Sequence, residues 1–333
     1  MRVANILLLG AGFSANWGAP VTSVVFNALI ADPEVRGDRP MHDLLWRNRG
    51  NFENALAALQ ENFRRDQQRQ REPLLLMQRA MQRTFERING IFTRQSFELE
   101  DGQPIDRNRT VVDFLAKFDA IFTLNQDLLL EIHYFDHTHN ALTNRRWNGG
   151  CVPGMAPAGA VGNGAIWSGR TWSPNGDYAI PNNVQPFVKL HGSTNWKDTG
   201  ANADIMIMGG GKTEAIQAIP VLHRYQGIFA EYARHGDTRV TVIGYGFGDG
   251  HINAILRDGI ENRGLRMFVI DPRGAGLAFD ARPLREGQIG YGPTEFEEWF
   301  QRGLYSASTM PFRRLLREES VEIGVLSDFL AGR

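Results

Sequence analysis

The chain has 333 residues, of which 42% are hydrophobic and 22% charged, proportions typical of a globular protein with a buried core. The formal net charge is -1, so the overall charge favours neither a nucleic acid nor a membrane as partner. The single cysteine, Cys151, excludes an intrachain disulfide and a zinc site built from cysteines.

The first predicted element is a strand over Asn5 to Leu9, a continuous apolar run that ends at Gly10. Continuous apolar strands are typical of parallel sheets covered on both faces, and we expect a helix to follow from about residue 19. Only Arg2 adds charge before this run, and no apolar run reaches the length of a membrane span. We therefore expect no signal peptide, no membrane partner and a cytoplasmic location.

Residues 41–110 are predicted to form a mostly helical insertion. Helical spacing extends over 41–95, and we expect Pro73 to start the second helix of this region. Arg79, Arg83 and Arg87 form a stripe on that helix. Such a stripe is usually a solvated face, and a contact with a partner or a nucleic acid is the sharper alternative.

The segment "RTVVDFLAKF" predicts a short helix that leads into a strand over Ala120 to Leu124. Residues 140–183 are rich in Gly, Pro, Asn and Trp and predict a long loop that could serve as a lid. Strands and helices then alternate through "PFVKLHGS", "ADIMIMGG", "LHRYQGIFAEYARHG", "TRVTVIGYGFGDGHINAIL" and "RMFVIDPRG". The C-terminal part from about residue 293 is predicted to be helical. The fold class is therefore α/β, a Rossmann-like doubly wound parallel sheet in a single domain over residues 1–333.

Four predicted strands end in polar or Gly-rich segments: "GAGFS", "TLNQD", "KLHGS" and "GYGFGD". Ligands bind at the carboxyl ends of the strands in open α/β sheets, so we expect the four segments to face one crevice.

Gly10, Gly12 and Ser14 follow the first strand, and Gly244 and Gly246 repeat the pattern later in the chain. Glycine allows a backbone to approach a pyrophosphate closely, and the following helix start adds partial positive charge. A tight turn between a strand and a helix is the alternative for each. Two such turns in one sheet favour a dinucleotide.

Three polar residues stand at strand ends. Asp271 occupies a position where a carboxylate can accept a hydrogen bond from a ribose hydroxyl. Asn125 can both donate to and accept from a ribose or a carboxamide. Asp127 is as well placed to cap the next helix as to act in a site, whereas capping suits Asn125 less well.

His191 lies at a strand end between Lys189 and Gly192, where a neutral imidazole could act as a general base. A structural histidine is the alternative. We interpret His251 as a residue at a helix start, either structural or near the adenosine end of a ligand.

Two further patterns do not predict sites. His133, His137 and His139 match no metal motif, and we expect no metal in this protein. The segment "GGGKT" resembles a phosphate-binding P-loop, but Met206 stands where that motif requires its first glycine.

The four strand-end motifs, in this order, resemble the sirtuin family. "GAGFSANWGAP" resembles the sirtuin phosphate-binding loop, "TLNQD" is similar to the family's T-Q-N-x-D, and "KLHGS" resembles the segment of the catalytic histidine. The resemblance extends from residue 6 to about residue 272, with long unmatched stretches between the motifs.

The chain also departs from the protein-deacylating sirtuins. It lacks the four cysteines of their zinc module, it has "VTS" after Pro20 in place of a Phe-Arg pair, and Leu124 replaces their glutamine. "KLHGS" together with "GYGFGDGHIN" is more similar to the sirtuin-like NAD hydrolases of bacterial antiphage defence.

This resemblance implies an NAD glycohydrolase that depletes NAD during abortive infection, with NAD as substrate and no metal. His191 would then act as the base or activate a ribose hydroxyl, Asn125 would position water or ribose, and Asp127 would hold the nicotinamide end. The phosphates would lie on the first turn, formed by Gly10, Ala11, Gly12 and Ser14. The adenosine side would lie on Gly244, Gly246 and Asp271.

The resemblance also implies a homo-oligomer and a separate regulatory partner such as a HerA-type ATPase, without direct contact to nucleic acid. Two alternatives remain open. One is an NAD-dependent protein deacylase or ADP-ribosyltransferase, and the other is a non-catalytic sensor of NAD or ADP-ribose.

Overall fold

The computed structural model describes residues 4–48, 51–98, 110–136, 146–158, 165–201, 203–279 and 294–333. A seven-stranded sheet with the order β11-β10-β9-β1-β2-β6-β3 forms the centre of the described structure. Every pair of adjacent strands in it is parallel. Its strands are β1 (Asn5–Leu9), β2 (Ala120–Thr123), β3 (Gly150–Cys151), β6 (Gln185–Lys189), β9 (Arg239–Ile243), β10 (Arg266–Ile270) and β11 (Leu304–Ser308).

The first strand, β1, lies in the middle of this sheet, between β2 and β9. Its residues 6–9 are fully buried, which explains why the strand is apolar without alternation. The chain forms β2, the edge strand β3 and then β6 on one side of β1, and it returns to the other side of β1 to form β9, β10 and β11. The order therefore reverses between β1 and β9, which confirms the predicted doubly wound sheet.

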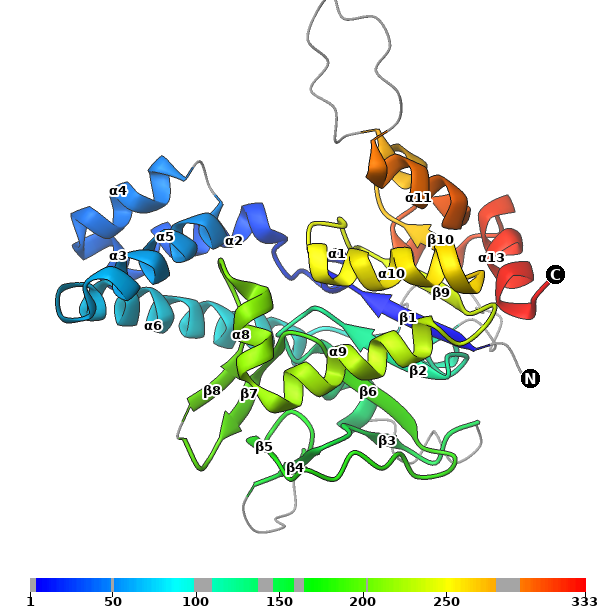
Figure 1. Ribbon diagram of the computed structural model, residues 1–333, viewed down its shortest axis with the longest axis horizontal. Helices are drawn as coiled ribbons and strands as arrows, with labels where there is room; N and C mark the ends of the chain where they lie inside the picture. The colour runs from blue at the N-terminus through cyan, green and yellow to red at the C-terminus, as the bar shows by residue number, and fades with distance from the viewer. Residues whose placement is uncertain are drawn as a thin grey trace, which may run out of the picture.

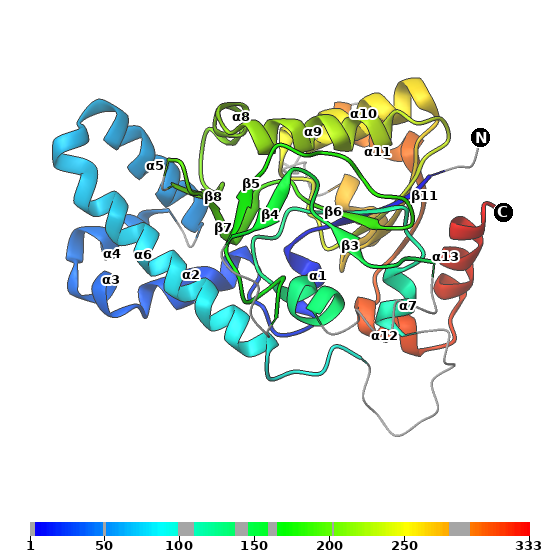
Figure 2. The ribbon, with the colours of Figure 1, turned by 90° about the horizontal axis from the view of Figure 1, so that it is seen from below.

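Helices cover both faces of the sheet (Figure 2). The register pairs Phe122 of β2, through Leu8 and Val242, with Val269, so Phe122 and Phe268 lie on opposite faces. Phe122 packs on α9 and Phe268 on α13. The helices around the sheet are α7 (Val111–Leu115), α9 (Pro220–Ala233), α10 (Gly250–Arg263), α11 (Glu295–Gly303), α12 (Phe312–Arg317) and α13 (Val321–Ala331).

The segment between β1 and β2 forms a separate group of helices, coloured blue to cyan in Figure 1. They are α2 (Thr22–Ile30), α3 (Pro33–Gly37), α4 (Arg39–Arg47), α5 (Phe52–Arg65) and α6 (Gln67–Phe92). Their apolar side chains form their own core, which includes Leu29, Leu45, Leu56 and Met77. No helix within the described ranges is both long and apolar enough to span a bilayer.

One short helix was not predicted, and one predicted helix start is wrong. The helix expected from about residue 19 is α2, which starts at Thr22, and a five-residue helix, α1 (Ala11–Ala15), precedes it directly after Gly10. Pro73 lies inside α6, and not at its start. Asp66 caps this helix by accepting a hydrogen bond from the Arg69 N–H at 3.0 Å, so the cap fixes the start and Pro73 costs only one internal hydrogen bond.

Two of the three arginines in the α6 stripe form ion pairs within the helical group. Arg83 forms ion pairs with Asp32 at 2.7 Å and with Glu34 at 2.6 Å, and Arg79 pairs with Glu34 at 2.7 Å. The hydrogen bonds from Arg83 lower the pKa of Asp32, whose carboxylate also caps α3. These two arginines therefore tie α6 to α3, while Arg79 and Arg87 are both exposed, as the sequence suggested for the stripe.

The described parts of the predicted loop over 140–183 contribute strands to a second sheet. This sheet has the order β4-β5-β7-β8 and contains β4 (Met155–Pro157), β5 (Trp172–Pro174), β7 (Gly192–Asp198) and β8 (Ala203–Met206). Trp167 and Trp172 are buried, and Asn195 Nδ2 donates to the Trp167 carbonyl at 2.8 Å. The aromatic side chains that suggested a loop thus anchor the segment.

The turns after β1 and β9 lie directly against each other. Gly10 N–H donates to the Ile243 carbonyl and Gly12 N–H to the Gly244 carbonyl, both at 3.0 Å. Gly244 has a φ of +64°, and a Cβ atom there would lie 2.4 Å from the Gly12 Cα atom. The contact between the two turns therefore requires glycine.

We predict that Gly244→Ala lowers the free energy of unfolding by about 2 kcal/mol or more, through backbone strain and the clash with Gly12. Gly248→Ala is the matched control, because a Cβ atom there would meet nothing within 4 Å. Urea unfolding of both variants measures the difference. Equal stability of the two variants would contradict the required contact.

Candidate active site

A cleft of about 1520 Å³ opens at the carboxyl ends of the central strands. It is larger than the roughly 300–1,000 Å³ typical of pockets for drug-sized ligands. All ten residues that the sequence singled out lie on its wall: Gly10, Ala11, Gly12, Ser14, Asn125, Asp127, His191, Gly244, Gly246 and Asp271. The described residues of 140–183 do not line this cleft, so they give no support to the lid interpretation.

The two glycine turns form the floor of the cleft at the point where the strand order reverses. The N–H groups of Gly10 and Gly12 both donate to the neighbouring turn and are not free for a phosphate. For these two glycines the tight-turn alternative therefore accounts for the residue type. A ligand can still approach the backbone of the two turns closely, because glycine has no side chain.

Asn125 is held by two hydrogen bonds beside Ser14. Its Nδ2 donates to the Gly10 carbonyl and to Ser14 Oγ, each at 3.0 Å. The Ser14 hydroxyl also acts on the Asp127 carboxylate and acts to lower its pKa. Asn125 is thus held by the first turn and is not a helix cap, and its Oδ1 remains as the acceptor for a ligand.

Asp127 has both of the positions that the sequence left open, at a helix start and on the cleft wall. Its Oδ1 accepts a hydrogen bond from the Leu129 N–H at 3.1 Å, as a residue that caps a helix start does. The residue also lines the cleft. Burial raises the pKa of Asp127, and the nearby Lys189 ammonium and the Ser14 hydroxyl oppose that rise.

Lys189 lies behind Asp127 and is almost completely buried. Its Nζ donates to Glu131 Oε1 at 2.6 Å and also to the Asp127 carbonyl. Burial raises the pKa of Glu131, while the Lys189 charge and hydrogen bond act against it. The ammonium is therefore the counter-charge for the carboxylates on this side of the cleft.

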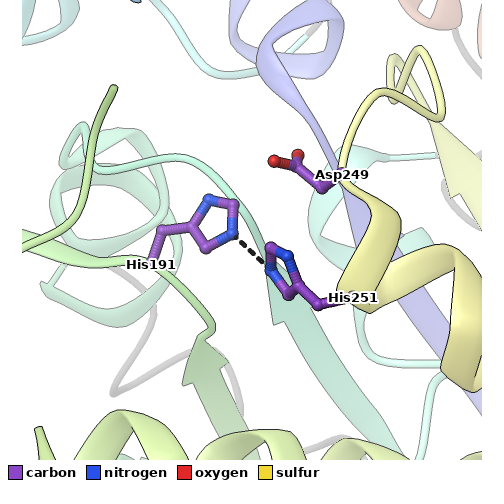
Figure 3. Close-up of side chains that lie close together, drawn as sticks. All are labelled: His191, Asp249 and His251. Carbon is purple, nitrogen blue, oxygen red and sulfur yellow. Dashed lines mark hydrogen bonds between the residues drawn. The ribbon is translucent and has the colours of Figure 1, made fainter. Parts of the chain in front are cut away.

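His191 follows β6 at a sharp reversal of the chain. The reversal is at Gly192, where φ is +78° and a Cβ atom would lie 2.0 Å from the Ile205 carbonyl oxygen. The His191 side chain is only 2% exposed, and its Nε2 lies 3.0 Å from His251 Nε2 (Figure 3). Burial lowers the pKa of His191 to about 3, so its imidazole is neutral near pH 7.

His251 stands at the start of α10, as interpreted from the sequence, and its Nε2 lies next to that of His191, the predicted catalytic histidine (Figure 3). The turn before α10 contributes Gly244, Gly246 and Asp249 to the cleft wall. Burial also lowers the pKa of His251.

Three charged residues beside the histidines were missed by the sequence analysis. Lys212 Nζ donates to Asp249 Oδ1 at 2.9 Å and to Glu53 Oε1 at 3.1 Å. Burial acts to raise the pKa of Asp249, but His191, Lys212 and His251 outweigh it and the net pKa is lowered. Asp249 ends the strand-end motif "GYGFGD", so its place in the sequence indicated a site residue. Glu53 comes from α5, and no sequence pattern indicated that it would lie at the site.

The remaining candidates have structural partners. Asp271 Oδ1 accepts hydrogen bonds from the N–H of Arg273 at 3.0 Å and from its Nε at 3.1 Å. His133 lies 2.9 Å from the Phe92 carbonyl, while His137 and His139 lie outside the described residues.

The sequence matches the family model described as "SIR2-like domain" over residues 119–289, which is more than half of the chain. The chain belongs to the SIR2-like family. This is a family of NAD-dependent enzymes whose domains bind NAD. No curated protein matches the chain. The turn at Gly10 precedes the matched segment, but β1 pairs with β2 and β9, which lie inside it.

The low pKa of His191 predicts a specific loss of stability in acid. The unfolded chain binds a proton below pH 6.5 and the folded chain does not until about pH 3, so unfolding becomes easier as the pH falls. His191→Gln should remove this contribution, which is at most about 1.4 kcal/mol for each pH unit. Urea unfolding between pH 7.5 and 5 measures it, and parallel pH profiles of variant and wild type would contradict it.

Breaking the buried Lys189–Glu131 pair should cost about 3–5 kcal/mol of stability, because Lys189→Met leaves a buried carboxylate without its counter-charge. The double variant Lys189→Met, Glu131→Leu should lose less, since it removes both charges. Denaturant unfolding compares the two. A double variant less stable than the single one would refute this electrostatic explanation.

Proposed function

We propose that this SIR2-like protein hydrolyses NAD at the nicotinamide–ribose bond and releases nicotinamide and ADP-ribose. The observation that carries the proposal is the convergence of Asn125, Asp127 and His191 on one end of a large cleft in a domain that binds NAD.

The order of the strands supports a particular direction for the dinucleotide. Asp271 follows β10, and His191 follows β6, which lies four strand positions away. At the usual spacing of adjacent strands this separates the two ends by about 19 Å. The glycine turns lie between them. The proposal therefore has the adenosine near Asp271, the phosphates over the turns and the nicotinamide ribose near Asn125.

The proposed reaction needs no redox step. Water attacks the ribose carbon C1′ while the bond from C1′ to the pyridinium nitrogen breaks, and the bonding electrons leave with nicotinamide, which becomes neutral. The water loses one proton. The ribose carries positive charge in the transition state, so catalysis depends on placing the reactants and on groups that stabilise that charge.

His191 is the group proposed to accept the proton. Its imidazole is neutral near pH 7 and so offers a lone pair, and the burial that lowers its pKa makes it a weaker base than a free imidazole. Its contact with His251 orients the ring. The same residue could instead accept a proton from a ribose hydroxyl.

Asn125 and Asp127 are proposed to bind the reacting end of the substrate. The two hydrogen bonds of Asn125 Nδ2 fix the side chain and leave Oδ1 to face a ribose hydroxyl or the water. A carboxylate at Asp127 would stabilise positive charge on the ribose. Ser14 lies between the two groups, since its Oγ accepts from Asn125 Nδ2 and its hydroxyl acts to lower the pKa of Asp127.

The proposed cellular role is antiphage defence, in which the enzyme depletes NAD and so aborts the infection. Its support is the resemblance of the sequence motifs. In the same proposal the protein is a homo-oligomer under the control of a separate partner, such as a HerA-type ATPase. Assaying cleavage with and without the product of a neighbouring gene tests this part.

We predict that His191→Ala and Asn125→Ala each reduce NAD cleavage by about 10²- to 10⁴-fold, the usual cost of losing a base or a positioning group. Chromatography of nicotinamide and ADP-ribose, using purified protein with and without its partner, measures the rates. His223→Ala is the matched control, because His223 is an exposed histidine on α9 outside the cleft.

The same experiment separates the alternatives. Cleavage at the wild-type rate by His191→Ala would remove His191 from the mechanism. Binding of NAD without release of nicotinamide under any condition would indicate a sensor. Turnover of acetylated peptide would indicate a deacylase, against which the single cysteine argues.

A further inference from the structure

Three potential metal ligands face one another at the edge of the cleft: His191, Asp249 and His251 (Figure 3). Their ligand atoms all lie within 4.8 Å of one another. We propose that this cluster binds a divalent transition-metal ion of the Zn²⁺ class, which occupies His191 and inhibits the enzyme. Only the inhibition rests on the function proposed above.

The two histidines are already spaced for such an ion. Their Nε2 atoms lie 3.0 Å apart. Two Zn–N bonds of about 2.0–2.1 Å at a tetrahedral angle place the nitrogens about 3.3–3.4 Å apart. The rings therefore need to separate by only a few tenths of an ångström, and the ion takes the place of the proton that one Nε2 donates to the other.

The third ligand is the Asp249 carboxylate, which does not cap helix α10. Asp249 precedes α10 at the capping position, but its side chain makes no capping hydrogen bond. Its Oδ1 accepts a hydrogen bond from Lys212 at 2.9 Å, which leaves the other oxygen to coordinate the ion. The carboxylate points into the space beside the two rings (Figure 3).

The local charge also favours a cation. Lys212 brings one positive charge, but Glu53 and Asp249 both pair with it, so these three groups carry a net negative charge. Histidine has an ordinary pKa of about 6.5, so both imidazoles offer lone pairs at pH 7.5. The positive charge of the Lys212 ammonium is thus already balanced by the two carboxylates before the ion binds.

The kind of ligand selects the kind of metal. Imidazole suits Zn²⁺, Ni²⁺, Cu²⁺ and Fe²⁺, whereas Mg²⁺ and Ca²⁺ prefer oxygen. His191 and Asp249 both line the cleft, so the fourth position of a tetrahedral ion would face the cleft and hold water. An ion bound in this way uses the His191 lone pair, and His191 can no longer accept a proton.

The first test is metal binding by the full chain, measured with Co²⁺ through its visible absorption and with Zn²⁺ in competition. We expect one equivalent to bind wild-type protein, and His251→Gln to weaken binding at least about tenfold. Asp249→Asn is a second variant in case His251→Gln fails to fold, and His223→Gln is the matched control. Unchanged affinity in both ligand variants, or no binding by wild type, would overturn the proposal.

The second test measures release of nicotinamide. Added Zn²⁺ should suppress it in wild-type protein, and EDTA should restore it. Persistent cleavage with the cluster fully occupied would overturn the inhibition. A protein that binds Co²⁺ at the cluster but never cleaves NAD would refute the proposed function and leave the metal site standing.

Discussion

The approach of the turn after β9 to the turn after β1 determines the shape of the cleft. Gly12 donates to the Gly244 carbonyl at 3.0 Å, and neither turn has room for a side chain at the contact. Because β1 and β9 are adjacent where the strand order reverses, this contact brings the two halves of the sheet together. The polar strand ends of both halves are thereby fixed around one cleft.

The contact also sets the positions of the reactive side chains. Asn125 is bound to the Gly10 carbonyl and to Ser14, so it is placed by the first turn and not by its own strand alone. His251 is placed by the second turn, which brings the start of α10 opposite His191. A change in either turn should therefore disturb the site as well as the fold.

Charges lie on both sides of this site, buried around Lys189 and half-buried around Lys212, and each is paired. Lys189 balances the carboxylates of Glu131 and Asp127, and Lys212 joins Asp249 to Glu53 of the helical group. Isolated charges at this depth would be costly, so the pairs let carboxylates persist beside a cleft. The Lys212 pairs also connect the helical group to Asp249, which lies beside the histidines.

Local sequence predicted the five inner strands of the sheet and most of the cleft, but not the edge strands β3 and β11. An apolar strand such as β1 and a polar strand end such as the one at Asn125 are local features, and the rule for open sheets brings them together. The position of His251 was not predictable in this way. It depends on a turn in which Phe247 adopts a φ of +56°, a conformation that bulky residues disfavour.

Long-range pairs were also beyond sequence analysis. Lys212 meets Glu53 across 159 residues of sequence and Asp249 across 37, and nothing in the surrounding residues indicates either partner. The start of α6 was missed for a local reason, since the Asp66 cap outweighs the effect of Pro73. A capping aspartate can be recognised in a sequence, and at this helix start Asp66 determines the boundary more strongly than Pro73 does.

A structure of the His191→Ala variant with NAD bound would test the central claim most directly. The account predicts the nicotinamide ribose beside Asn125 and Asp127, the phosphates over the turns at Gly10 and Gly244, and the adenosine near Asp271. Density for NAD in the reverse direction, or outside this cleft, would contradict it.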